Sequence, residues 1–360
     1  MNNQQYIDPE ALIIFIYIFG GLMVCMILLT FIFLRARKKK WMIKKQLDEI
    51  FDNWLGEWIL EDLNEDTQLS IPPTLVDTPG NAYSRQYAVD QLINTKKNLI
   101  GIAGQNTVWL YEKLGLKKIS LDNFHSRQWF LKAKGIYELY MMEQKDMQDE
   151  LFPYTNSSNE YVRTEAQTAI LAFEGFEGLR FFNTLTHPIT NWQQIKLMEQ
   201  LRPLDPPGIF EDMPNWLQSS NPMVVQFALK LAGEYQQFQV LDCVYKCLGS
   251  EHPAIREQAI IALVRMGDET SASAIIERYN NETKNNKQTI LRSLYHVAST
   301  NELPFLLEVY ETGDGDTKLL AARAIAHIGP AGMERLAAKG QEQPEPYEQI
   351  YLHIKSEIAR

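Results

Sequence analysis

The sequence has few cysteines. Its 360 residues contain three, Cys25, Cys243 and Cys247, which are too few for a disulfide framework. Cys243 and Cys247 stand four residues apart on a predicted helix, where two thiolates would supply half of a tetrahedral metal site. The sequence offers no second pair of ligands. We therefore interpret both as small residues packed on a helix, and we expect no metal and no other cofactor.

Catalytic motifs are also lacking. The six histidines are scattered, and no His-Glu-x-x-His motif is present. The turn from Gly101 to Gly104 lacks the Lys-Ser/Thr of a phosphate loop. The segment 313–316 fails as a calcium loop because Lys318 takes the next ligand position, so we predict instead that Asp316 caps a helix. These absences predict a protein that is not an enzyme, with no catalytic residue and no small-molecule substrate.

Positive charge is scarce outside one short segment. The formal net charge is −10, and residues 35–45 hold seven of the 35 Lys and Arg residues. From residue 46 onward, 28 Lys and Arg face 43 Asp and Glu. A protein that binds nucleic acid neutralises phosphates with Lys and Arg on its body. The composition therefore excludes nucleic acid as a partner and favours a basic or mixed-charge protein.

Residues 11–34 contain no charged residue. As a helix they extend about 36 Å, against a hydrocarbon core of about 30 Å. We predict a transmembrane helix over 11–34 after a short N-terminus, 1–10. A cleaved signal peptide would need a basic first region, a shorter apolar core and a small-residue cleavage site. The cations follow the span, so the positive-inside rule places the N-terminus outside and the C-terminal part in the cytoplasm, at a bacterial inner membrane.

The segment after the span predicts a membrane interface. Its cations attract anionic lipid by about 1 kcal/mol each near the surface. The stem, residues 35–63, continues as an amphipathic helix whose spacing places Ile50, Trp54 and Trp58 on one face. The predicted interface residues are Arg35, Arg37, Lys38, Lys39, Lys40, Trp41, Lys44 and Lys45.

A period of 31 residues runs through the rest of the chain. Steps of 31 from Ala259, Leu263 and Met266 all reach apolar residues, and these three positions follow helical spacing. A second apolar set, which includes Ile275, repeats in the same way. Each unit is therefore predicted to be two amphipathic helices, which bury their apolar faces only when neighbouring units stack. The first two series are Ala166, Leu197, Ala228, Ala259, Ile290 and Ala321, and Ile170, Leu201, Ala232, Leu263, Leu294 and Ile325.

The predicted fold class is all-α, with one transmembrane helix followed by an α-solenoid of helical hairpins. We place a helical cap region over 64–125, about seven 31-residue units over 126–342, and a C-terminal capping helix over 343–360. One unit departs from the pattern, because Pro214 falls inside its second helix. We expect that helix to be shortened and to begin near Pro214, since proline is tolerated at the start of a helix.

These residues resemble the HEAT-repeat family, in its short bacterial form related to phycobilisome lyases. The likeness rests on the motif Pro-x-Ile/Val-Arg-x-x-Ala-x-x-Ala-Leu, complete in Pro253 to Leu263 and partial in Val162 to Ile170. Tetratricopeptide and ankyrin arrays have periods of about 34 and 33 and signatures that this sequence lacks. Some HEAT proteins bind iron at His-Glu pairs, and no such dipeptide occurs here. The resemblance implies a solenoid that docks a protein partner.

The predicted function is a non-catalytic, membrane-anchored scaffold whose cytoplasmic solenoid binds a protein. By analogy it would be an accessory subunit of a bacterial envelope system such as a membrane glycosyltransferase. Two alternatives stay open: an enzyme of lyase or hydroxylase type on a HEAT scaffold, and a lipid-binding membrane organiser. Binding in such arrays usually uses the second helices, and their outward positions one period apart are Lys246, Glu277, Glu308 and Lys339.

Overall fold

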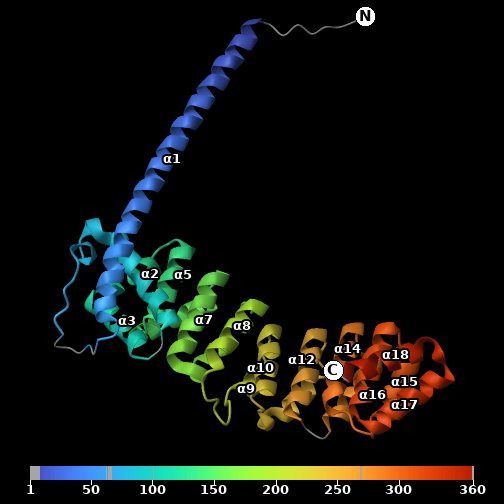
Figure 1. Cartoon of the computed structure of the whole chain (residues 1–360). Coiled ribbons are helices and arrows are strands. Elements are labelled where there is room, and N and C mark those ends of the chain that lie inside the picture. The colour runs from blue at the N-terminus through green and yellow to red at the C-terminus, as the bar shows by residue number, and fades with distance from the viewer. Residues whose placement is uncertain (1–8, 62, 64–66, 100, 268–269, 359–360) are drawn as a thin grey trace, which may run out of the picture. The chain divides into compact units, whose positions relative to one another are not determined.

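The computed structural model describes residues 9–61, 63, 67–99, 101–267 and 270–358. These residues form 18 α-helices, seven 3₁₀-helices and no strand, which confirms the predicted all-α fold class (Figure 1). The chain divides into two compact units, residues 1–144 and 145–360. The first unit holds a buried cluster between residues 47 and 142, and the second holds another between residues 171 and 354.

Helix α1 (Pro9–Trp58) is one continuous helix of 50 residues, about 75 Å long at 1.5 Å per residue. Figure 1 shows it extending far beyond the helices that it packs against. Its apolar segment, Ile13–Arg35, is not buried by any of the residues that the structure describes. The first buried side chain among those described is Leu47, which lies about 18 Å along the helix from Arg35. The predicted apolar helix is thus present, and it continues without a break into the packed part of the first unit.

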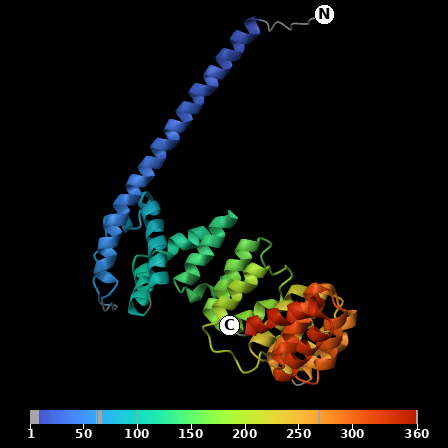
Figure 2. The ribbon, with the colours of Figure 1, turned by 45° about the vertical axis from the view of Figure 1, so that its right-hand side comes forward.

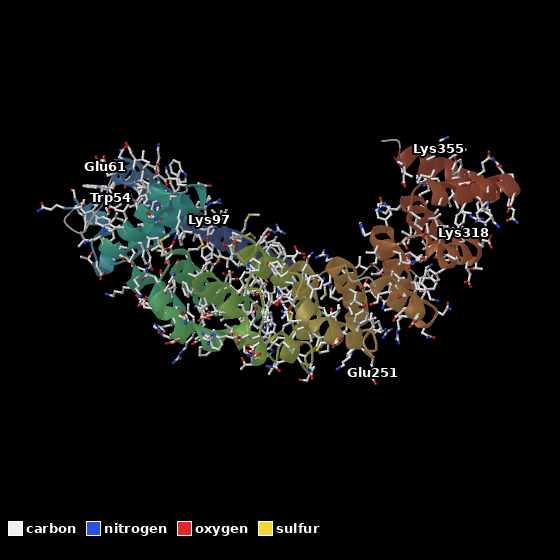
Figure 3. The ribbon with its side chains drawn as sticks, turned by 90° about the horizontal axis from the view of Figure 1, so that it is seen from below. Trp54, Glu61, Lys97, Glu251, Lys318 and Lys355 are labelled. Atoms are coloured by element: carbon white, nitrogen blue, oxygen red, sulfur yellow. The ribbon has the colours of Figure 1, made fainter. Side chains whose placement is uncertain are left out.

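The packed end of α1 buries only part of the face that the spacing indicates. Trp54 is buried and Trp58 is half-buried, whereas Ile50 is 40% exposed. The buried face runs instead through Leu47 and Phe51, because successive residues on a helix point about 100° apart and Ile50 is turned away from Phe51. The Nε1 atom of Trp54 donates a hydrogen bond of 2.6 Å to the carbonyl of Ser70, and Figure 3 shows this side chain in the first unit.

In the rest of the first unit, a buried arginine on α2 bonds the turns that connect the other helices. Arg85 is 1% exposed and donates to the carbonyls of Leu75, Leu114 and Gly115 at 2.7 to 3.1 Å. These bonds pair Nη1 and Nη2 of the guanidinium with backbone oxygens from two turns and so fix both turns to α2. The elements are η1 (Pro73–Leu75), η2 (Pro79–Asn81), α2 (Ala82–Asn98), α3 (Ile102–Lys113), α4 (Lys117–Phe124) and α5 (Trp129–Met141).

The second unit alternates first helices of 11 to 15 residues with second elements that are shorter in every hairpin up to α15. Its elements are η3 (Lys145–Met147), α6 (Gln148–Leu151), η4 (Phe152–Asn156), α7 (Glu160–Glu174), η5 (Gly175–Asn183), α8 (Asn191–Leu201), α9 (Met213–Trp216), α10 (Pro222–Glu234), η6 (Phe238–Val240), α11 (Leu241–Cys247), α12 (Pro253–Met266), α13 (Ser271–Arg278), η7 (Tyr279–Asn281), α14 (Lys284–Val297), α15 (Leu303–Thr312), α16 (Gly315–His327), α17 (Pro330–Glu342) and α18 (Pro344–Ile358).

The first helices of the second unit follow the predicted period. Helices α7, α8, α10, α12, α14 and α16 begin at residues 160, 191, 222, 253, 284 and 315, so each begins 31 residues after the one before. Helices α10, α12, α14, α16 and α18 each contact the next, and Figure 2 shows the C-terminal members stacked against one another. The chain therefore forms the predicted solenoid of helical hairpins.

Two of the three predicted core series are fully buried. All twelve residues of the two series that contain Ala259 and Leu263 are at most 1% exposed. In the third series Met266 is buried, Leu204 is 38% exposed because it lies in the loop after α8, and the other members, Phe173, Tyr235, Val297 and Ile328, are half-buried. Helix α9 begins at Met213, with Pro214 next, and has only four residues. The predicted shortening of this helix near Pro214 is confirmed.

The residues just before the first helices also recur every 31 positions. At five of them the side chain accepts a backbone N–H bond of the first turn, which satisfies a donor that would otherwise be unpaired. Asp314, and not the predicted Asp316, caps α16: its carboxylate accepts from the N–H of Thr317, while Asp316 lies within the first turn. The five caps are Asn159, Thr190, Asn221, Thr283 and Asp314.

Candidate functional site

The four predicted partner-binding residues lie on four successive second helices, α11, α13, α15 and α17, which we name the second-helix row. Lys246, Glu277 and Glu308 are exposed, one on each of the first three helices. Lys339 on α17 is different. Its Nζ atom lies 2.5 Å from Oε1 of Glu311, and its side chain is 18% exposed. The structure thus presents three of these side chains to solvent and engages the fourth in an ion pair.

A groove of about 470 Å³ opens beside Lys246, where α11 meets the turns before α10 and α12. Burial, and to a smaller extent the nearby Cys243, raises the pKa of the Cys247 thiol in this groove to about 11. A thiol with this pKa stays protonated at neutral pH and is a poor nucleophile and a poor metal ligand. Within the part of the chain that the structure describes, no group of three or more His, Cys, Asp or Glu residues is arranged to hold a metal ion. The groove also contains Ser219, Ser220, Pro222, Val225, His252 and Ile255.

Ion pairs join neighbouring units along the solenoid. Lys196 lies 2.6 Å from Glu165, and Arg256 lies 2.7 Å from Glu282. The buried Arg256–Glu282 pair holds the start of one hairpin against the start of the next. Further pairs that join residues 28 to 34 positions apart are Arg265–Glu234, Lys284–Asp314, Lys339–Glu311 and Arg323–Glu357.

Arg163 and Arg256, which stand three periods apart, play the same structural part. Nη1 of Arg163 donates to the carbonyl of Ser157 at 2.7 Å, and Nη1 of Arg256 donates to that of Ser250 at 2.8 Å. Lys318, two periods after Arg256 and shown in Figure 3, donates to the carbonyl of Tyr310 at 3.0 Å. Cations at this position bind the carbonyls of the preceding turn, where unpaired acceptors attract them.

The predicted membrane-interface residues follow the apolar segment of α1. Arg35, Arg37, Lys38, Trp41, Lys44 and Lys45 are exposed, and the side chains of Lys39 and Lys40 lie outside the described residues. Nζ of Lys45 lies 5.9 Å from the ring centroid of Trp41, within the range of a cation–π contact. The apolar segment is long enough to cross a membrane, a property that it shares with signal sequences near an N-terminus.

One buried carboxyl group, that of Glu138, was not predicted from the sequence. Glu138 is fully buried in the first unit, and this burial raises the pKa of its carboxyl group. Gln86 and Asn123 donate hydrogen bonds of 2.6 and 3.1 Å to its oxygens, and Lys134 lies 3.6 Å away. The partners come from helices up to 52 residues apart and follow no period, so no local signal in the sequence marks them.

Comparisons with known proteins agree with this architecture over part of the chain. Residues 213–294 match the family model described as HEAT repeats. No curated protein matches the chain. Among solved structures, an engineered protein is 14% identical, covers 77% of this chain and 85% of its own, and has a TM-score of 0.37. Human deoxyhypusine hydroxylase in complex with glycerol is 17% identical, with coverages of 78% and 98% and a TM-score of 0.29.

These structural scores are too low to carry an argument, so the α-solenoid fold rests on the 31-residue helical period, with the family match over part of the chain. The match spans α9 to α14, which includes two helices of the second-helix row. Residues 213–294 are therefore similar to HEAT repeats, and they lie in an α-solenoid that continues to α18.

Proposed function

We propose that this chain is a non-catalytic, membrane-anchored scaffold whose solenoid docks a protein partner on the second-helix row. The observation that carries the proposal is α1, in which one continuous helix joins a fully exposed apolar segment to the packed first unit. Apolar surface left in water costs about 25 cal/mol per Å², so a lipid environment for this segment is strongly favoured. HEAT arrays generally act as protein-interaction surfaces.

The geometry of α1 supports a defined arrangement at the membrane. Arg35 and Trp41 stand where the apolar segment ends, as lipid-interface residues do. About 18 Å of helix separates Arg35 from Leu47, where the packed body starts. The body is acidic and the inner leaflet is anionic, so repulsion would keep the body away from the lipid surface while the stem binds it. The N-terminus would lie outside and the solenoid in the cytoplasm.

The anchor is tested with the full chain in its native membranes. We expect the intact 41.6 kDa chain in the alkali-resistant membrane fraction, with a C-terminal tag inaccessible to protease added outside. The double substitution Ile18→Arg and Met26→Arg should release it into the soluble fraction. Leu60→Arg, the same kind of change at a residue 78% exposed outside the span, should leave it in the membrane. A membrane-free chain that begins near residue 35 would identify a signal sequence instead.

The docking role is tested by crosslinking in the same membranes, followed by mass spectrometry. One dominant protein partner that is lost when Lys246, Glu277 and Glu308 are reversed in charge would support the scaffold. The envelope system named above remains a prediction until that partner is identified. Stoichiometric metal in the purified chain would support the enzyme instead. Loss of function when the cations of residues 35–45 become Gln, with insertion preserved, would support the lipid organiser.

A further inference from the structure

The hairpin that begins with α8, just before the second-helix row, has an unusually short second helix. The second elements α11, α13, α15 and α17 have 7, 8, 10 and 13 residues, whereas α9 has four. The chain between α8 and α9, residues 202–212, contains Pro203, Pro206 and Pro207. Prolines have no backbone N–H and clash with a preceding helical turn, so this segment does not extend α9 at its N-terminal end.

The shortened element leaves a groove of about 480 Å³ between η5 and α9. Its floor is aromatic. The ring of Phe176 stands edge-on to that of Phe210 at 5.3 Å between centroids, and edge-on to that of Tyr235 at 5.2 Å. Phe210 and Trp216 are buried, while Phe176 stays partly accessible. The groove therefore offers aromatic side chains beside the short helix α9.

The edge of the groove presents an apolar side chain from a fixed backbone. Gln237 is 3% exposed and belongs to the next hairpin. Its Oε1 accepts the N–H of Phe210 at 3.0 Å, and its Nε2 donates to the carbonyl of Gly208 at 3.4 Å. Ile209 lies between these two bonded residues and is 61% exposed. Because hydrogen bonds hold the backbone on both sides of Ile209, the fold of the loop itself keeps this side chain exposed.

The charge around the groove is negative. Glu177 and Glu211 are exposed at its rim, and Asp212 lies beside them. The cation in the lining, Arg180, is already compensated, because it donates two hydrogen bonds of 3.0 and 2.5 Å to Glu174. Its guanidinium also lies 4.2 Å from the ring centroid of Phe152. An incoming segment would meet the exposed carboxylates of Glu177 and Glu211 beside an aromatic floor.

We propose that this groove binds an amphipathic basic helix of a partner protein, which packs beside the short helix α9. The proposal rests on the scaffold function above, and it adds a contact surface next to the second-helix row and names the partner chemistry. Helices dock in such grooves with apolar anchors at i, i+3 or i+4 spacing. Anchors of this kind would contact Phe176 and Ile209, while Lys or Arg at the helix edges would pair with Glu177 and Glu211.

The test uses the full chain in nanodiscs of zwitterionic phosphatidylcholine, with empty nanodiscs as background. The probe is a fluorescent peptide of roughly 14 residues, about four helical turns, built from Leu, Ala and Lys with Leu at helical spacing. We expect saturable binding by anisotropy, and none for the same peptide with Glu in place of Lys. The double variant Glu177→Lys and Glu211→Lys should bind at least tenfold more weakly. Ile209→Ala should also weaken binding without any change of charge.

A matched control lies on the last helix, outside the second-helix row and the groove. Glu345→Lys with Glu348→Lys makes the same charge change at exposed positions on α18, and it should change the affinity less than twofold. Absence of saturable binding, equal loss in both double variants, or binding of the Glu peptide would each overturn the proposal. None of these results bears on the scaffold function itself, which the crosslinking experiment decides separately.

Discussion

Arg256 and Glu282 form a two-hydrogen-bond ion pair between consecutive hairpins. Nε and Nη2 of Arg256 donate to the two carboxylate oxygens of Glu282 at 2.7 and 2.9 Å. The side chain of Arg256 is 11% exposed and that of Glu282 is 1% exposed. Nη1 of the same guanidinium donates to the carbonyl of Ser250. One side chain therefore links the turn before α12 to the turn before α14.

Removing the charge of Glu282 should destabilise the solenoid. In Glu282→Gln the buried Arg256 loses its counter-ion, and we expect a loss of about 2 kcal/mol, which corresponds to roughly 5 °C in Tm for a unit of this size. Glu277→Gln, at an exposed position, should stay within about 0.5 kcal/mol of the parent. Thermal unfolding and hydrogen exchange in α12 and α14 measure both effects. Equal melting temperatures for the two variants would show that the pair contributes nothing.

The same pair should make stability depend on pH in the acid range. Burial alone would raise the pKa of Glu282, but hydrogen bonds from Arg256 and Asn286 outweigh it and hold this pKa below its usual value. An unfolded Glu titrates near 4.3. The contribution of the pair is therefore complete above about pH 4.3 and is lost as pH falls through the lower folded pKa. The difference in urea midpoint between the parent and Glu282→Gln should shrink as pH falls below about 4. A constant difference down to pH 2 would contradict this.

Helix α12 should gain stability from a better cap. His252 occupies the cap position of the 31-residue series, but its side chain makes no capping bond, whereas Asn221 one period earlier accepts from the N–H of Met223. His252→Asp should stabilise the chain by roughly 0.5 to 1 kcal/mol. Asn221→Ala should cost more than 1 kcal/mol, because Nδ2 of Asn221 also donates to the carbonyls of Leu185 and His187. Denaturant midpoints give both values, and a destabilised His252→Asp would show that the imidazole has another role.

The sequence predicts the second unit better than the first, for a physical reason. Positions such as Ala259 and Leu263 are buried in hairpin after hairpin. Each hairpin therefore needs an apolar residue at the same position, and the sequence shows this requirement as a 31-residue period. In the first unit, the packing of α1 and the partners of Glu138 join residues tens of positions apart with no repetition. Spacing predicts the exposed positions Lys246, Glu277 and Glu308 on the second helices, but not the ion pair that engages Lys339. Spacing carries no information on whether these positions bind a partner, because an exposed side chain leaves no packing signal in the sequence.

Gly332 should tolerate no side chain. A Cβ atom at this position would lie 1.8 Å from the backbone carbonyl oxygen of Ile325, so α16 and α17 would have to move apart. We expect Gly332→Ala to cost roughly 2 to 3 kcal/mol. Gly315→Ala is the control, because nothing lies within 4 Å of a Cβ there, and the change should be neutral or stabilising by about 0.5 kcal/mol. Hydrogen exchange of α16 and α17 compares the two, and equal protection would show that the contact relaxes easily.

Cys247 should be unreactive in the folded chain and reactive once it unfolds. With the pKa of its thiol raised to about 11, chiefly by burial, the thiolate fraction at pH 8 falls far below that of an unfolded cysteine with a pKa near 8.5. In the variant Cys25→Ser with Cys243→Ser, alkylation by iodoacetamide at pH 8 should be roughly 100-fold slower without urea than with it. The native rate should rise about tenfold per pH unit from 8 to 10. Since the unfolded thiol ionises first, this group should also lower stability as pH rises above about 8.5. Fast alkylation of the native chain at pH 8 would contradict this prediction. It would show that the Cys247 thiol is accessible in the groove beside Lys246 and could act as a metal ligand.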